Sequence, residues 1–243
     1  IKLLVTHINH YLTKKHSLLD NDFIEKYLKV VLVTHEKDYY LELYSKYLAK
    51  RLLFIKYDIE KESEIINHFK KNLGFSATIK IENMIKDIML HTDEINSKYK
   101  VLTLSHWPIY KNTKCLISKE IQDKLNEYKQ QYSEKFSQRR VEWNNDISTA
   151  TIYLNLDKKY QITISLIEYS ILNLYMKQEI YQIKEIAEEL RMEKGKCLVY
   201  VENLFKHKIL ISEDKELDED STITFNKNFS YKKLHFTIPL PSI

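Results

Sequence analysis

The sequence predicts a mainly α protein with a small β component, in which a helical bundle precedes an α/β region and a winged helix. Only 2 of the 243 residues are Gly and 3 are Pro, so folds built on tight, Gly-dependent hairpins are disfavoured. Up to about residue 136, apolar residues recur every three to four positions, and beyond it they alternate with polar residues. The first period is typical of amphipathic helices and the second of half-buried strands.

Residues 1–136 are predicted to form a four-helix-bundle-like region, because several one-sided apolar stripes follow each other with short links. The stripes are Phe23, Tyr27, Leu28, Val31 and Leu32; Tyr44, Tyr47, Leu48, Leu52 and Ile55; Ile65, Ile66 and Phe69; Ile81, Met84, Ile85, Ile88 and Met89; and Ile121, Leu125, Tyr128, Tyr132 and Phe136.

Residues at the ends of these stripes are suited to capping. Asp20 or Asn21 can cap the helix that follows, and Ser118 can cap the long last helix. Gly74 stands where a left-handed C-cap is needed, and Phe75 is expected to fold back on the preceding turn.

Changes of period divide the second half of the chain. Residues 137–164 are predicted to be an α/β region, residues 165–226 a winged helix, and residues 227–243 a strand that returns to the sheet. The predicted elements are strands at Ala150–Leu156 and Tyr160–Ile164, helices near 166–176, 182–190 and 196–206, a two-stranded hairpin at Ile209–Ile211 and Thr222–Phe225, and a last strand carrying Leu234, Phe236 and Ile238.

Composition excludes several classes of protein. The two glycines, Gly74 and Gly195, lie too far apart to form a dinucleotide fingerprint or a P-loop. Two cysteines give neither a disulfide framework nor a four-Cys zinc site, so we expect a cytoplasmic and nuclear protein. There is no apolar run of about 18 residues, so no membrane span is expected. No cofactor is predicted. Because Ile1 begins no signal-peptide pattern, the chain is expected to be an excised piece of a longer one.

The histidines and short basic pairs are weak signals. His7, His10 and His16 lie close together near the start of the chain, but a zinc site needs three or four converging ligands of fitting geometry. Their simplest interpretation is solvent-facing histidines on an amphipathic helix, and no metal site is predicted. Trp107 and Trp143 are expected to anchor a core or an interface.

Charge is distributed unevenly along the chain. The net charge is +4, but residues 98–140 hold ten Lys and Arg against four acids, whereas Ser212–Asp220 holds six acids and one Lys. A basic strip could bind phosphates or an acidic protein tail, or could be a solvated helix face. The acids lie where a DNA-reading winged helix would carry basic groups, which disfavours nucleic-acid binding by this module.

Five ordered segments resemble the cullin homology domain. Tyr47–Leu53 resembles its LAKRLL helix, and Leu73–Ile88 resembles its Cys-Gly-Phe segment with the Lys, Met and Asp-Ile that follow. Val101–Pro108 resembles its Val-Leu…Trp-Pro segment, and Ser137–Trp143 resembles Ser-Gly-Arg-Lys-Leu-x-Trp. Tyr231–Ile238 resembles the strand after its first winged helix. The chain therefore resembles the cullin family, with the cullin-1 type as the nearest resemblance.

The resemblance implies a non-catalytic scaffold of a multi-subunit RING ubiquitin ligase. In the family, the α/β sheet takes in a strand from a small zinc-binding RING-box subunit, which recruits the ubiquitin-charged conjugating enzyme. The residues that would build the receiving sheet are Arg139, Arg140, Val141, Trp143, Ile152, Leu154, Leu234, Phe236 and Ile238. Lys14 and Lys15 resemble a pair in the family's basic canyon, which attracts the acidic tail of some conjugating enzymes.

The sequence also departs from the family pattern. Gln138 replaces a Gly, Ser105-His106 replaces the Gly usual before Trp-Pro, and the link from Asn96 to Val101 is shortened. By this resemblance, we expect these residues to stop before the family's second winged helix, which carries the lysine modified by the ubiquitin-like activator. We also expect them to lack the family's N-terminal repeats, which hold the substrate adaptor.

Two alternatives stay open. A winged-helix nucleic-acid-binding protein would use the basic strip of residues 98–140, and its affinity would fall steeply with salt. The cullin-like subunit of the anaphase-promoting complex would share the fold within a different assembly.

Overall fold

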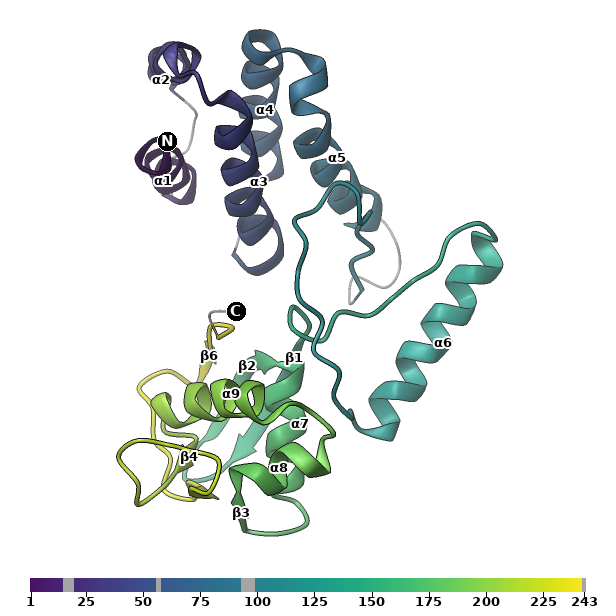
Figure 1. Ribbon diagram of the computed structural model, residues 1–243, viewed down its shortest axis with the longest axis vertical. Coiled ribbons are helices and arrows are strands. Elements are labelled where there is room, and N and C mark those ends of the chain that lie inside the picture. Colours follow the sequence, from purple (N-terminus) through teal and green to yellow (C-terminus); the bar gives the residue numbers. More distant parts are fainter. Residues whose placement is uncertain (15–19, 56–57, 93–98, 242–243) are drawn as a thin grey trace. The chain divides into compact units, whose positions relative to one another are not determined.

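The computed structural model describes residues 1–14, 20–55, 58–92 and 99–241, with the side chains of 91 and 92 excluded. The chain divides into two compact units, Ile1–Ile109 and Tyr110–Ile243, which are described separately (Figure 1). The mainly α architecture with small sheets confirms the predicted fold class. The finer regional boundaries at residues 136, 164 and 226 stay predictions.

The first unit is a bundle of helices. Within the described residues it contains α1 (Lys2–Thr13), α2 (Asn21–Val33), α3 (Lys37–Phe54), α4 (Ile59–Leu73) and α5 (Phe75–Thr92). The side chain of Asp20 accepts hydrogen bonds from the N–H groups of Asp22 and Phe23, which confirms the predicted cap of α2.

Helix α3 lies at the centre of this unit and packs against α1, α2 and α5. Its Tyr44 meets Phe69 of α4 edge to face, with ring centroids 4.9 Å apart and both side chains fully buried. Arg51 of α3 also enters the core, where it forms a two-point ion pair with Glu62 of α4 at 2.5 and 2.8 Å. A third guanidinium nitrogen of Arg51 donates to Asn9 of α1 at 2.8 Å, so one cation joins three helices.

The link between α4 and α5 is a single residue. Gly74 has φ +90°, a positive value that favours glycine. Its backbone N–H donates a hydrogen bond to the Lys70 carbonyl. Phe75 is the first residue of α5 and stays partly exposed, but its ring meets the last turn of α4, in agreement with the expectation. The ammonium of Lys70 lies 4.8 Å from the centroid of that ring.

The second unit contains one long helix, α6 (Lys119–Lys135), and two small sheets. Ser118 is the N-cap residue of α6, but its side chain makes no capping hydrogen bond. The aromatic stripe of α6 packs against the segment that follows it, with the rings of Tyr128 and Trp143 5.6 Å apart.

The first sheet has the strand order β1-β2-β6. It comprises β1 (Thr149–Asn155), β2 (Lys159–Ser165) and β6 (His235–Thr237). Strands β1 and β2 are antiparallel, and β6 runs parallel to β2. The alternation predicted for the first two strands is confirmed, because Tyr160, Ile162 and Ile164 of β2 are buried while the residues between them are more exposed.

The winged helix lies next along the chain. It contains α7 (Leu166–Leu174), β3 (Ile180–Gln182), α8 (Ile183–Glu189), α9 (Lys194–Lys206), β4 (Leu210–Ile211) and β5 (Thr222–Phe225). The antiparallel pairing of β4 with β5 confirms the predicted hairpin. The second sheet has the order β3-β5-β4, so β3 adds a strand that was not predicted. Strand β3 has three residues and is too short to show an alternating pattern.

Two buried carboxylates fasten the winged helix to its surroundings. Glu168 forms a capping box with Ser165 at the start of α7. It also accepts from the amide of Asn203 at 2.6 Å, and the same amide donates to the carbonyl of Pro239 just after β6. Asp146 accepts from Thr113 and Tyr200 and so joins the segment before α6 to α9.

Candidate strand-accepting edge

The first sheet has two edges in the described part of the chain, since β2 lies between β1 and β6. The orientation of the β1 backbone follows from two hydrogen bonds at its ends, Leu156 N–H to the Lys158 carbonyl and Leu166 N–H to the Ser148 carbonyl. Hydrogen-bonded positions alternate in an antiparallel pair. The even-numbered residues of β1 therefore direct their N–H and C=O groups toward β2.

The odd-numbered residues of β1 direct the same groups away from the sheet. We call the outward N–H and C=O groups of Thr149, Thr151, Tyr153 and Asn155 the β1 edge. No described strand pairs with this edge. It therefore offers a row of main-chain donors and acceptors to an added strand.

Side-chain burial also marks β1 as incompletely covered. Its core-facing residues Ala150, Ile152 and Leu154 are only half-buried. Their neighbours on β2, Tyr160 and Ile162, are 1% and 0% exposed. A strand laid beside β1 would cover the apolar flank that these three residues leave exposed, and burial of that area is favourable.

The two edges differ in how well they are protected. Thr149–Asn155 contains neither a charged residue nor a Pro. Strand β6 has only three residues, follows Lys232 and Lys233, and is followed by Pro239 and Pro241. Lys, Pro and short length are the usual devices that prevent an edge from pairing. The β1 edge is therefore the better acceptor of the two.

The structure separates the nine residues expected to form the receiving sheet. Ile152 and Leu154 lie on β1, Phe236 lies on β6, and Ile238 is buried just beyond it. Leu234 immediately precedes β6 and is 45% exposed, so its role in the receiving sheet stays a prediction. The carbonyl of Leu234 nevertheless accepts from the N–H of Gln161 at 2.7 Å.

The segment Arg139–Trp143 forms no strand in this structure. Arg139 and Arg140 are exposed, and the guanidinium of Arg139 lies 5.2 Å from the centroid of the Phe136 ring. Val141 is buried, and Trp143 packs against Tyr128 of α6. This segment therefore covers α6 and lies outside the three strands of the sheet.

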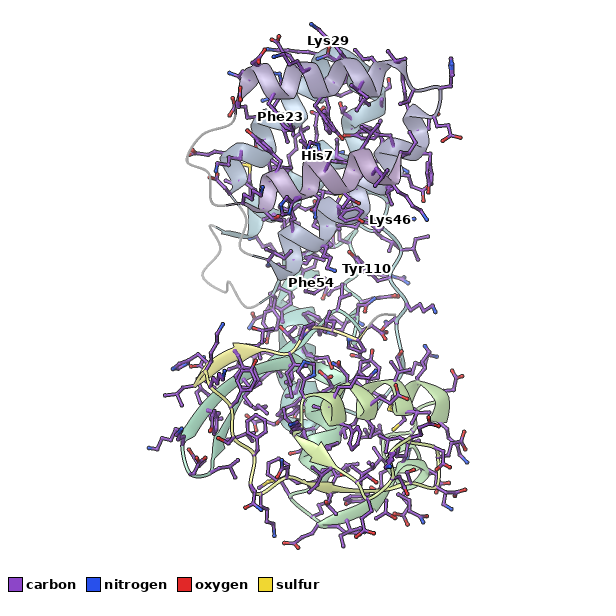
Figure 2. The ribbon with its side chains drawn as sticks, turned by 90° about the vertical axis from the view of Figure 1, so that its left-hand side faces the viewer. His7, Phe23, Lys29, Lys46, Phe54 and Tyr110 are labelled. Atoms are coloured by element: carbon purple, nitrogen blue, oxygen red, sulfur yellow. The ribbon has the colours of Figure 1, made fainter. Side chains whose placement is uncertain are left out.

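The remaining polar candidates lie in the first unit. Lys14 follows α1 and is exposed, whereas Lys15 and His16 are outside the described residues. His7 is also exposed and meets the ring of Phe23 edge-on at 5.6 Å (Figure 2). Among the residues that the structure describes, no group of three His, Cys, Asp or Glu side chains could hold a metal ion, and no helix is long and apolar enough to cross a membrane.

The two cysteines have the character of packing residues. Cys197 is fully buried in the core of the second unit, and burial raises its pKa to about 12. Burial and the nearby Asp146 raise the pKa of Cys115 to about 11. Both thiols are therefore protonated near neutral pH, and protonated thiols are poor nucleophiles.

Sequence patterns alone did not single out the polar backbone of Thr151 and Tyr153, because only the neighbours of a strand show whether its edge is open. The available signal was the absence of charge and Pro from Thr149–Asn155.

Among the described residues, the chain combines a bundle of helices with a winged-helix unit whose small sheet has an unprotected edge. Two family descriptions match the chain, the cullin alpha solenoid domain over residues 1–95 and the cullin alpha+beta domain over residues 101–229. The chain belongs to the cullin family.

Several curated cullins are similar to the chain. Cullin-2 of Arabidopsis thaliana is 28% identical over 241 residues, covering 90% of this chain and 32% of the relative. Cullin-1 of Oryza sativa subsp. japonica is 26% identical, covering 91% and 33%. Cullin-4A of Homo sapiens is 23% identical, covering 98% and 35%. The chain thus spans about a third of the length of these relatives, and a cullin-1 type stays a prediction.

Proposed function

We propose that this chain is part of a non-catalytic cullin scaffold in a cytoplasmic and nuclear ubiquitin ligase, and that it binds a RING-box zinc protein by accepting one of its strands at the β1 edge. The observation that carries the proposal is that β1 combines outward-pointing main-chain groups with two apolar side chains, Ile152 and Leu154, that are only half-buried. Main-chain bonds supply affinity in such an addition, and alternate side chains supply specificity.

The proposed work of the scaffold is positional. The RING-box subunit recruits a ubiquitin-charged conjugating enzyme, and holding that enzyme near a substrate raises the rate through proximity. Lys14 and Lys15 are proposed to attract an acidic tail of the conjugating enzyme, an attraction that salt would screen. The substrate adaptor is proposed to bind the longer protein outside these residues.

Coexpression with a RING-box protein followed by gel filtration tests the proposal. We expect a stoichiometric complex with the unaltered chain. Tyr153→Pro removes an outward N–H without touching the bonds between β1 and β2, so we expect the complex to be lost. Ile152→Asp places a charge on the flank that the added strand would cover and should have the same effect.

Thr237→Pro is the matched control. Thr237 is exposed on β6 and its N–H also points away from β2, as the bond from the Ile238 N–H to the Thr163 carbonyl shows. This variant should keep the complex. Loss of the complex with Thr237→Pro but not with Tyr153→Pro would move the binding site to β6. Absence of any complex with the unaltered chain would refute RING-box binding.

A further inference from the structure

The β1 edge is complementary to a second copy of itself. In an antiparallel arrangement with Ile152 opposite Ile152, all seven residues of Thr149–Asn155 find a partner on the other copy. The outward-facing residues then pair with each other, Thr151 with Tyr153 and Thr149 with Asn155. Both members of each pair carry an outward N–H and C=O, as hydrogen-bonded pairs of an antiparallel ladder require.

The side chains fit in the same arrangement. On the core-facing side, Leu154 of one copy stands opposite Ala150 of the other, so a large side chain meets a small one, and the two Ile152 side chains meet in the middle. On the exposed side, Tyr153 stands opposite Thr151, and aromatic with β-branched pairs are favourable across strands. The residues left half-buried in one copy are thus covered by the same residues of the other.

Charge does not oppose this pairing. No residue of Thr149–Asn155 is ionisable at neutral pH, and like charges directly opposite each other are what usually separate two edges. A shift of register by two residues would leave one end of the strand without a partner. The fully overlapped, two-fold register is therefore the favoured one, and its symmetry closes the assembly at two copies.

We propose that, when no strand donor is bound, two copies of this chain pair through their β1 edges, with the two-fold axis at Ile152. The pairing rests on the edge alone. Its competition with the RING-box strand rests on the proposed function, because both partners need the outward groups of Thr151 and Tyr153. One seven-residue edge buries less than the area of about 1,000 Å² typical of stable interfaces, so the dimer is weak and depends on concentration.

Disulfide trapping of the 243-residue chain tests the register. At the axis, the two Ile152 residues form a non-hydrogen-bonded pair, in which the Cα atoms lie about 4.5 Å apart, within the range a disulfide spans. Ile152→Cys should therefore form a covalent dimer under mild oxidation. The native Cys197 is buried and Cys115 is half-buried, so the background is low.

Two variants separate register-specific trapping from random collision. Tyr153 is 70% exposed and Thr237 is also exposed, so collisions would favour Tyr153→Cys and Thr237→Cys over Ile152→Cys. The proposed dimer predicts the reverse order. It sets Tyr153 opposite Thr151, with the second Tyr153 diagonal to it at about 7–8 Å and beyond disulfide reach. We expect about tenfold more covalent dimer from Ile152→Cys than from Thr237→Cys.

Sedimentation equilibrium of the chain with its native cysteines gives a second readout that does not depend on oxidation. The mass should rise above the monomer mass of 29.3 kDa with concentration, and Tyr153→Pro should abolish the rise. A chain that stays monomeric over the whole range, or a covalent dimer that follows side-chain exposure, would overturn the inference.

Addition of a RING-box protein distinguishes the two proposals. Suppression of the Ile152→Cys dimer supports both. Trapping that persists because no RING-box complex forms removes the proposed function but leaves the self-pairing intact. If a RING-box complex forms but the free chain shows neither covalent trapping nor a mass increase, the proposed function stands and the self-pairing is refuted.

Discussion

The hydroxyl of Tyr200 donates a 2.7 Å hydrogen bond to the carboxylate of Asp146, 54 positions earlier in the chain. Tyr200 lies on α9 of the winged helix, and Asp146 lies just before β1. The same carboxylate accepts from the backbone N–H and from the hydroxyl of Thr113, the latter at 2.7 Å. Three segments of the second unit are thus joined by one buried side chain, which fixes the turn that leads into β1.

Asp146→Ala is expected to lower the free energy of unfolding by about 3 kcal/mol or more, because it leaves buried donors of Thr113 and Tyr200 without their acceptor. Tyr200→Phe removes one of the bonds and should cost about 1 kcal/mol. Urea unfolding followed by far-UV circular dichroism measures both. The exposed wing residue Asp214 gives the control, since Asp214→Ala should change stability by less than about 0.5 kcal/mol. Equal effects at Asp146 and Asp214 would contradict the proposed junction.

The buried ion pair of the first unit gives a second prediction. Arg51 and Glu62 are 2% and 3% exposed, so Glu62→Gln leaves a buried guanidinium without its counter-ion and should cost about 3–5 kcal/mol. Glu42→Gln makes the same chemical change in an exposed pair with Lys46 on α3, and should lower the free energy of unfolding far less, because water screens the pair. Urea unfolding of the two variants should therefore differ clearly. If both lose the same small amount, Arg51 does not join the helices in the way described.

Glu168 makes stability depend on pH. Its carboxyl is buried, and burial raises its pKa although Asn203 and Ser165 donate hydrogen bonds to it. The folded state therefore binds the proton more tightly than the unfolded state. The resulting stabilisation is complete below the unfolded pKa and is lost as pH rises through the raised, folded value.

Glu168→Gln removes this titration. The free energy of unfolding of the unaltered chain, relative to that of Glu168→Gln, should fall as pH rises above the ordinary pKa range of a glutamate carboxyl. Urea unfolding at a series of pH values measures this difference. A difference that stays constant or rises with pH would show that burial does not control this carboxyl.

Local features could be predicted from the sequence more successfully than the question of which strands lie side by side in the sheet. Alternation located β1 and β2, and the cap at Asp20 located the start of α2. The period of a strand shows which side chains share a face, but it does not show which strand lies beside it. That β2 is central and β1 is an edge depends on the return of β6 from more than 70 residues later.

The polar contacts that hold the site could not be predicted for the same reason. In the sequence, Asp146 cannot be distinguished from an exposed loop acid, because its partners Thr113 and Tyr200 are far from it along the chain. The expected role of Arg139–Trp143 came from family resemblance, whereas the aromatic contact of Trp143 with Tyr128 depends on how the chain turns after α6.

Amide hydrogen exchange, resolved by residue, tests the central claim most directly. In the free chain at a concentration where it is monomeric, the N–H groups of Thr151 and Tyr153 point outward and should exchange fast, while those of Ile152 and Leu154 bond to β2 and should be protected. Saturation with a RING-box protein should protect Thr151 and Tyr153 and leave His235 and Thr237 of β6 unchanged. New protection confined to β6, or a complex that leaves Thr151 and Tyr153 exchanging fast, would contradict strand addition at the β1 edge.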